Sequence, residues 1–147
     1  MMASNISDDN KNDEDLNNFH NCKYVELEEI EKNLSTDKFA FKAMHFNIRS
    51  LNENFHKLQI LLHNLSESKL NIDFLLLCET FINDQNCMMF NLSGYSKVEN
   101  HRKTSRGGGV AIYVKNGIDF KIRDDLCIFE EGNIESLFIE ATLNKKQ

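Results

Sequence analysis

The segment that decides the fold is residues 72–78, which read Ile-Asp-Phe-Leu-Leu-Leu-Cys and are followed directly by Glu79. The apolar residues of this segment do not alternate with polar ones, a pattern typical of a strand that is buried on both faces of a sheet. In α/β folds, ligands collect beyond the carboxyl ends of such strands. The sequence therefore predicts a central strand that presents Glu79 at one edge of a sheet.

An amphipathic helix is predicted just before this strand. Its apolar residues recur at alternating four- and three-residue steps, at Leu51, Phe55, Leu58, Leu62 and Leu65. We expect Ser50 to be the N-cap residue and Glu53 to complete a capping box with it. The helix is expected to end around residues 66–69.

Residues 39–48, FAFKAMHFNI, predict a further strand in front of the helix, with Asn47 near its carboxyl end. One face of that strand is expected to carry Phe39, Phe41, Ala43, His45 and Asn47, with His45 packed or capping rather than acting as a base. The order strand, helix, strand predicts a parallel crossover, so that Asn47 and Glu79 end neighbouring strands.

Three more segments downstream predict strands. Residues 96–99 form a short one, and residues 109–122, GVAIYVKNGIDFKI, read as two strands joined by Asn116-Gly117 in a type I′ hairpin turn. Residues 135–143 alternate in polarity and predict a last strand. The expected fold class is α/β, with a mixed sheet and one main helix.

Composition limits the organisation of the chain. Its 147 residues leave room for one ordinary domain, and a hydrophobic share of 41% is enough for a packed core. The net charge of −6 arises from residues 1–35, which we interpret as a flexible acidic tail with one short helix at 24–34. The domain, residues 36–147, is then neutral. This neutrality removes any global attraction to nucleic acid and leaves a local one open.

The sequence also bears on location. The first residues lack the basic and apolar regions of a secretory signal, and the longest apolar run, 74–78, is far too short to span a bilayer. The four cysteines are widely spaced and form no C-x-x-C pair, which favours reduced structural thiols. We expect an intracellular protein, nuclear or cytoplasmic, that is not secreted and has no membrane partner.

Three local features are candidates for chemistry: Asn47, Glu79, and the loop Arg106-Gly107-Gly108. Magnesium binds one or two carboxylates together with phosphate oxygens and water, and an amide beside the carboxylate can donate to a phosphate oxygen. Each feature also has a purely structural interpretation, as a turn residue, a solvated carboxylate or a flexible loop. The residues alone leave both interpretations open.

Longer motifs carry a family resemblance. The stretches HFNIRSL (45–51), IDFLLLCETFI (72–82) and GYSKVENHRKTSRGGGVAIYVKNG (94–117) resemble the endonuclease/exonuclease/phosphatase superfamily. The particular resemblance, over residues 39–143, is to the apurinic-type endonuclease domain of non-LTR (LINE- or jockey-like) retrotransposons. It implies a DNase I-like fold, a four-layer α/β sandwich of two face-to-face sheets with helices outside.

The resemblance also implies roles for the candidate residues. Asn47 and Glu79 correspond to catalytic residues near the scissile phosphate, and both lie at the Mg²⁺ (or Mn²⁺) site, with Glu79 as the metal-binding carboxylate. Arg106, Gly107 and Gly108 fall on a loop that can approach DNA. The implied reaction is metal-dependent hydrolysis of DNA phosphodiester bonds, in a parent protein that also carries an RNA-directed DNA polymerase.

Other groups of that family fall after residue 143, so the resemblance implies that 36–147 is an amino-terminal half, a truncated domain that is inactive alone. A partner that covers an open sheet face is then expected. Two alternatives stay open. One is a phosphatase of the same superfamily that acts on phospholipids or inositol phosphates. The other is a non-enzymatic remnant or binding module, which would bind without cleaving.

Overall fold

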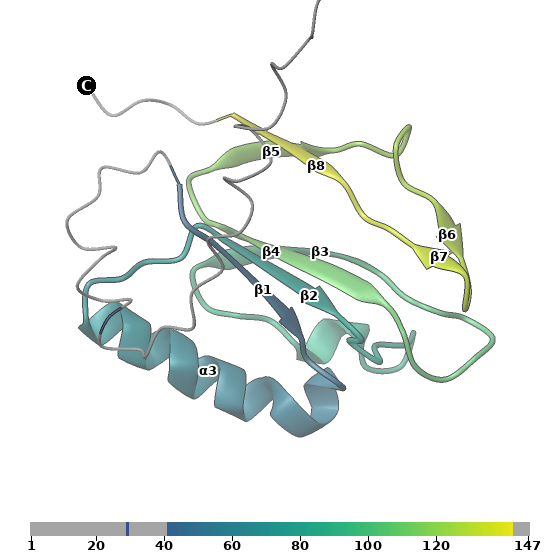
Figure 1. Ribbon diagram of the computed structural model, residues 1–147, viewed down its shortest axis with the longest axis horizontal. Coiled ribbons are helices and arrows are strands. Elements are labelled where there is room, and N and C mark those ends of the chain that lie inside the picture. The colour runs from purple at the N-terminus through teal and green to yellow at the C-terminus, as the bar shows by residue number, and fades with distance from the viewer. Residues whose placement is uncertain (1–28, 30–40, 143–147) are drawn as a thin grey trace, which may run out of the picture.

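The computed structural model describes Glu29 and residues 41–142 (Figure 1). Apart from Glu29, the predicted acidic tail of residues 1–35 lies outside the described residues, as do its short helix and Phe39. The elements in chain order are β1 (Ala43–Asn47), α3 (Leu51–Glu67), β2 (Phe74–Cys78), the 3₁₀ helix η2 (Cys87–Met89), β3 (Tyr95–Asn100), β4 (Val110–Lys115), β5 (Asp119–Ile122), β6 (Phe129–Glu130), β7 (Ile134–Glu135) and β8 (Ile139–Thr142).

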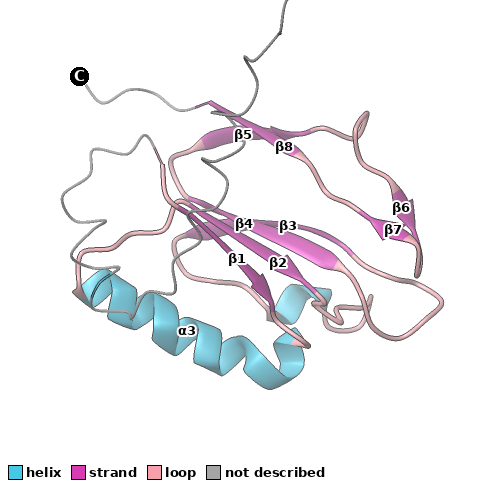
Figure 2. Ribbon diagram, in the orientation of Figure 1, coloured by secondary structure: helices cyan, strands magenta, loops and turns pink. Residues whose placement is uncertain are grey.

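The main sheet has four strands in the order β1-β2-β4-β3. β1 and β2 are parallel, whereas β4 runs antiparallel to both β2 and β3. Strands β1, β2 and β3 therefore point in one direction and β4 points in the other. The predicted α/β fold with a mixed sheet and one main helix is confirmed, and it is consistent with part of a DNase I-like sandwich (Figure 2).

The strand register aligns four residues across this sheet. Asn47 lies opposite Cys78, Cys78 lies opposite Val110, and Val110 lies opposite Asn100. The carboxyl ends of β1, β2 and β3 consequently lie at one edge, together with the amino end of β4. The parallel crossover predicted from the order strand, helix, strand is confirmed.

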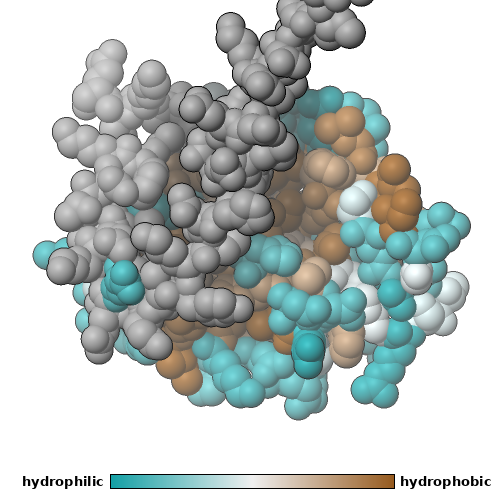
Figure 3. Space-filling view, in the orientation of Figure 1, coloured by the Kyte–Doolittle hydropathy of each residue, from teal (hydrophilic) through white to brown (hydrophobic). Residues whose placement is uncertain are grey.

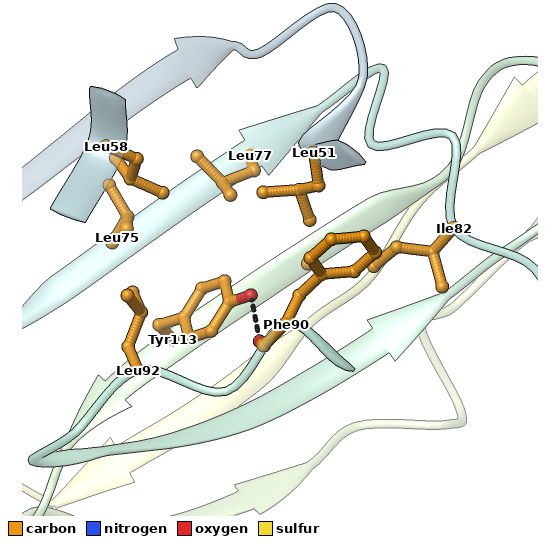
Figure 4. Packing of buried hydrophobic residues seen from close by; sticks show 9 residues of the cluster. Leu51, Leu58, Leu75, Leu77, Ile82, Phe90, Leu92 and Tyr113 are labelled. Atoms are coloured by element: carbon orange, nitrogen blue, oxygen red, sulfur yellow. Dashed lines mark hydrogen bonds between the residues drawn. The ribbon is translucent and has the colours of Figure 1, made fainter. Parts of the chain in front are cut away.

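Helix α3 covers one face of the sheet. Leu51, Leu58 and Leu65 are buried along it, and their seven-residue spacing, two helical turns, places them on one side. Figure 4 shows Leu51 and Leu58 pointing toward Leu75 and Leu77 of β2. The amphipathic pattern thus predicts both the helix and the face that packs against the sheet.

The start of the helix differs from the prediction. Ser50 is the N-cap residue, but its φ is +84° and its side chain makes no capping hydrogen bond, so the capping box with Glu53 is wrong. The backbone N–H of Ser50 instead donates to the carbonyl of Glu79 at 2.8 Å. The side-chain amide of Asn54 donates to the Ile48 carbonyl at 2.9 Å and so ties the first turn of the helix to the residues before it. A tertiary contact therefore decides this helix end.

Strand β1 has the predicted two faces. Met44 and Phe46 pack against the core, whereas Ala43, His45 and Asn47 are exposed. The expectation that His45 packs or caps is wrong, because its side chain lies on the open face of a strand at the edge of the sheet.

The central strand β2 is buried mainly on its helix side, where Leu75 and Leu77 are 0% and 2% exposed. Its other side is half-buried. On that second side of the sheet, Ile112 and Val114 of β4 are 6% and 0% exposed. The expected open sheet face, to be covered by a partner, is therefore not found here: the face opposite α3 is partly covered.

A second layer, residues 119–142, lies on the side of the sheet opposite α3 (Figure 1). It contains two short antiparallel ribbons, β5 with β8 and β6 with β7. The predicted hairpin of β4 with β5 is wrong, because these strands belong to different sheets. Gly117 has a φ of +94° while Asn116 does not have a positive φ, a combination that fits a type II turn and not type I′. The turn passes the chain from one layer to the next.

The strand predicted over residues 135–143 is broken in two. Between β7 and β8, the Ser136 hydroxyl accepts a hydrogen bond from the Ile128 N–H and donates to the Ile128 carbonyl, both at 2.8 Å. The Ser136 N–H still donates to the Ile128 carbonyl, but the Ile128 N–H is bound by a side chain, so the regular pairing is interrupted. Leu143 lies outside the described residues.

The second layer leaves much apolar surface uncovered, as Figure 3 shows over this region. Five of its large apolar side chains are 44–55% exposed: Ile122, Leu126, Ile128, Ile134 and Phe138. Backbone pairing and exposed side-chain contacts, such as the ion pair of Lys121 with Glu140, thus hold these ribbons together without giving them a core.

Two smaller predictions concern membranes and thiols. Among the residues that the structure describes, no helix is both long and apolar enough to cross a bilayer. Among the described cysteines, Cys78, Cys87 and Cys127 are free thiols, and the expected reduced state stays a prediction.

Candidate active site

The three strands that run in one direction each deliver a polar residue to the same edge of the sheet. Asn47 is the last residue of β1, Glu79 follows β2, and His101 follows β3. Neighbouring strands lie about 4.7–4.9 Å apart, so Asn47 is one such spacing from its register partner Cys78, which Glu79 follows directly. His101 lies two spacings, roughly 10 Å, beyond Glu79. The backbones of Asn47 and Glu79 therefore lie near each other at this edge, and His101 is not part of the same pair.

Backbone hydrogen bonds continue past the ends of the strands and hold this edge. The Ser50 N–H donates to the Glu79 carbonyl at 2.8 Å, and the Leu51 N–H donates to the Thr80 carbonyl at 2.9 Å. The Glu79 side chain is half-buried and that of Asn47 is exposed. The start of α3 is thereby attached to the segment that carries Glu79.

The same edge has unusual backbone conformations. Glu79 and Phe81 have φ values of +55° and +54°, and Arg49 and Ser50 have values of +46° and +84°. Side-chain-bearing residues rarely adopt such angles, which cost about 1–3 kcal/mol each and persist where the surroundings hold them. Among the described residues only one further non-glycine residue, Lys69, shares this property. Strain is thus concentrated where Asn47 and Glu79 meet.

The triple glycine packs tightly against this strained segment. The Phe81 N–H donates to the Gly108 carbonyl at 2.9 Å, and the Thr80 N–H donates to the Gly109 carbonyl at 3.3 Å. A Cβ atom on Gly109, whose φ is +82°, would lie 2.6 Å from the Thr80 hydroxyl. The glycines therefore permit a close approach to the segment after Glu79 and do not form a loose loop.

A carboxylate from the second layer fixes the glycines from the other side. Glu135 accepts a hydrogen bond from the Gly109 N–H at 2.5 Å and pairs with Arg102. Burial raises the pKa of Glu135, but the hydrogen bonds from Gly109, Gly132 and Arg102 outweigh it and leave the pKa lowered. A Cβ on Gly108 would lie 2.4 Å from both Arg102 Nε and a Glu135 oxygen. The loop is thus clamped between two layers.

Arg106 stands at the entrance to this loop. Its side chain is exposed, and it takes part in none of the ion pairs among the described residues. Its carbonyl accepts a hydrogen bond from Arg102 Nη1 at 3.4 Å. The backbone of the loop is therefore ordered, while the positive charge of Arg106 remains available to solvent. Gly107 beside it is half-buried.

Sequence reasoning did not single out Thr80. This residue is 0% exposed, and its hydroxyl has no hydrogen-bond partner among the residues that the structure describes. A buried hydroxyl without a partner is rare and marks a position of strain or function. Only the strand order places this hydroxyl beside the glycines, so no pattern in the sequence could have found it.

A histidine between two carboxylates was also missed. His101 Nε2 lies 2.9 Å from Asp84 Oδ1, and His101 Nδ1 lies 3.4 Å from Glu99 Oε2. That Glu99 oxygen is buried, and it accepts no hydrogen bond from the described part of the chain. Burial of Tyr113, and after it the charge of Glu99, raises the pKa of Tyr113. Tyr113 donates to the Phe90 carbonyl at 2.6 Å and stays protonated, so it supports the core (Figure 4).

The residues present fit a magnesium ion in part. Glu79 offers one carboxylate and Asn47 one amide oxygen, held on a rigid edge, and Mg²⁺ usually takes few protein ligands together with phosphate oxygens and water. Within residues 29 and 41–142, no three or more His, Cys, Asp or Glu side chains come together in a group that could hold a metal ion. Any metal here would therefore depend on ligands beyond these two side chains.

A cavity of about 410 Å³ lies at the opposite end of the sheet. It is formed between the last turns of α3 and the segments around Ile72, Tyr95 and Lys115. None of the predicted site residues lines it. The candidate site is thus an open edge, separate from this cavity.

Comparisons with known proteins reach only the level of the fold. No protein-family model matches the sequence, and no curated protein matches it. Among solved structures, an AP endonuclease from Leishmania major, LMAP, aligns with 21% sequence identity and a TM-score of 0.46. The alignment covers 75% of this chain and 39% of that structure, so the chain spans about two fifths of the enzyme it matches.

Proposed function

We propose that this chain contributes the Asn47–Glu79 edge to a magnesium-dependent endonuclease domain of the non-LTR retrotransposon type, which hydrolyses DNA phosphodiester bonds. The observation that supports this is the arrangement of the edge. Asn47 and Glu79 end neighbouring parallel strands, Glu79 is held at a φ of +55°, and the glycine loop packs beside it. We also propose that the domain begins at residue 36 and that it acts inside the cell.

Each residue would have a distinct task on the substrate. Glu79 and Asn47 would hold the magnesium ion, which supplies charge neutralisation at the leaving oxygen. The side-chain amide of Asn47 can also donate to a non-bridging oxygen of the phosphate. Arg106 would approach the neighbouring backbone phosphates, where its planar group can form paired hydrogen bonds. Gly107 and Gly108 would let the DNA backbone come close.

We further propose that this edge is inactive without additional protein. None of these residues is a base placed to activate water. His101 could act as a base, but its backbone lies roughly 10 Å from that of Glu79. The exposed apolar side chains of the second layer, such as Ile128 and Phe138, are the surface that such protein would cover. On this proposal the described residues form about half of a four-layer sandwich.

The test is the nicking of supercoiled plasmid by the 147-residue chain and by a version extended with a matching carboxyl-terminal half. The extended version should nick with Mg²⁺, and the 147-residue chain should not. Glu79→Gln should lower the rate of the extended version by about 10²–10³. Glu67→Gln, an exposed carboxylate at the far end of α3, is the matched control and should leave the rate unchanged.

Three results would contradict this function. Full activity of Glu79→Gln would refute the metal assignment. Turnover of inositol phosphates or phospholipids in place of DNA would identify a phosphatase. DNA binding that is unchanged by both Asn47→Ala and Glu79→Ala, with no cleavage by the extended version, would identify a binding module.

A further inference from the structure

The polar loop before the triple glycine wraps around a single carboxylate, that of Glu131. Three consecutive backbone N–H groups donate to it, those of Lys103 at 2.7 Å, Thr104 at 3.2 Å and Ser105 at 3.2 Å. The hydroxyls of Thr104 and Ser105 donate to it as well, at 2.6 and 3.1 Å. Five donors from three adjacent residues therefore converge on one anion.

Successive N–H groups that point into one concavity form an anion-binding nest, as in many phosphate sites. The hydrogen bonds from the Thr104 hydroxyl and the Lys103 N–H lower the pKa of Glu131 to about 2. The donors thus favour the charged carboxylate strongly over the neutral acid. The donors themselves do not distinguish a carboxylate from another oxyanion of similar size.

The charges around the nest favour a phosphate. Lys103 and Arg106 flank it, and neither is in an ion pair among the residues that the structure describes. Arg102 is paired with Glu135 and anchors the loop to β7. If Glu131 withdrew, two free cations and five donors would face solvent around an empty anion site.

The nest also lies close to the candidate active site. Ser105 is three residues from Gly108, whose carbonyl is bonded to the segment after Glu79. Three residues span at most about 11 Å. A DNA strand rises about 3.4 Å per nucleotide along the helix axis, so this distance corresponds to at most about three nucleotide steps.

We propose that the nest formed by residues 103–105 binds a backbone phosphate of DNA and that Glu131 occupies it as an internal substitute in the absence of DNA. The choice of DNA rests on the proposed function, whereas the anion site does not. Glu131 comes from the turn between β6 and β7, in the layer whose apolar side chains are exposed. Movement of that ribbon would open the nest.

The competing explanation for the same contacts is that they have a purely structural role. If Glu131 only ties the loop to the second layer, its removal should loosen residues 103–105 and create no affinity for anions. If the loop is a nest, its removal should expose a site that phosphate fills. The two explanations predict opposite behaviour toward added phosphate.

The experiment is a titration of the 147-residue chain with inorganic phosphate, and separately with a short oligodeoxythymidylate. It is followed by NMR at the amides of residues 103–105 with a chelator present. Glu131→Ala should bind both ligands at least about tenfold more tightly than the unaltered chain. Glu130→Ala, an exposed neighbour whose side chain makes no hydrogen bond or ion pair among the described residues, is the control and should behave like the unaltered chain. Adding Thr104→Val to Glu131→Ala should reverse most of the gain.

A second variant keeps the experiment informative if Glu131→Ala fails to fold. Glu131→Gln keeps the shape and an accepting oxygen without the charge, so phosphate should displace this side chain more easily than Glu131. Absence of ligand-induced shifts at 103–105 in both variants would overturn the proposal. Binding of phosphate without the oligonucleotide would overturn the assignment to DNA. Glu79→Gln should leave these shifts unchanged, which separates this result from that of the nicking assay.

Discussion

The two layers of the molecule contain the same kind of hydrogen-bonded strands but differ in what covers them. In the first layer, the main sheet with α3, Leu51, Leu75, Tyr113 and Val114 are all 0% exposed. In the second layer, residues 119–142, the large apolar side chains of Ile128 and Ile134 are 55% and 50% exposed. Both layers thus contain paired strands, but among the described residues only the first layer has a core of buried apolar side chains.

This contrast in burial indicates which layer should be the more stable and the better ordered. Burial of apolar area is the main favourable term in folding, whereas a paired backbone exchanges one set of hydrogen bonds for another. The first layer should therefore supply most of the free energy of folding. Asn47 and Glu79 belong to that layer, and the second layer reaches the site through the carboxylates of Glu131 and Glu135.

The largest effect is expected from truncating a core side chain. Leu75→Ala should destabilise the chain by about 2–5 kcal/mol, because it leaves a cavity beneath α3. Ile128→Ala, in the second layer, should change stability by less than about 0.5 kcal/mol. Urea denaturation followed by far-ultraviolet circular dichroism measures both. Similar losses in the two variants would remove the contrast between the layers.

A smaller effect separates backbone strain from close packing. Gly109 and Gly132 have nearly equal φ values of +82° and +79°, but a Cβ on Gly109 meets Thr80 and a Cβ on Gly132 meets nothing within 4 Å. Gly132→Ala should therefore cost only the backbone term, about 1–3 kcal/mol. Gly109→Ala should cost a further 1–3 kcal/mol or so for overpacking. Equal costs in the same denaturation experiment would mean that the loop yields to the added methyl group.

The smallest effect is a local response to acid. The pKa of Glu131 is about 2 in the folded chain and 4.5 in an ordinary glutamate. Its contribution is therefore fully present above pH 4.5 and is lost as the pH falls toward 2. NMR should show the amides of residues 103–105 changing over this range. Glu131→Gln should abolish that response, although Glu135, Arg102 and Lys103 remain nearby. A response that persists in this variant would assign it to Glu135.

Local pattern was sufficient for the first layer. The spacing of the leucines predicts α3 and its buried face, and the unbroken apolar run predicts β2 as a central strand. The same patterns predict that Asn47 and Glu79 end neighbouring strands, because a parallel crossover leaves little choice of geometry. Whether these two residues bind a metal stays a prediction.

The features that local pattern did not predict depend on contacts between residues that are far apart in the sequence. Asn116-Gly117 predicts a turn correctly but not its type, since β4 pairs with β2 and β3 and leaves β5 to pair with β8. The break at Ser136 depends on Ile128, which lies eight residues earlier. The nest around Glu131 joins segments 26–28 residues apart, and no spacing rule reaches that far.

The central claim is that Asn47 and Glu79 share one divalent cation, and binding of Mn²⁺ to this chain tests it directly. A paramagnetic ion broadens the NMR signals of nearby amides, so substoichiometric Mn²⁺ should first broaden those of residues 47–48 and 79–80. Glu79→Gln should abolish the broadening, and Glu67→Gln should not. Broadening that is centred elsewhere, or that survives Glu79→Gln, would contradict the account.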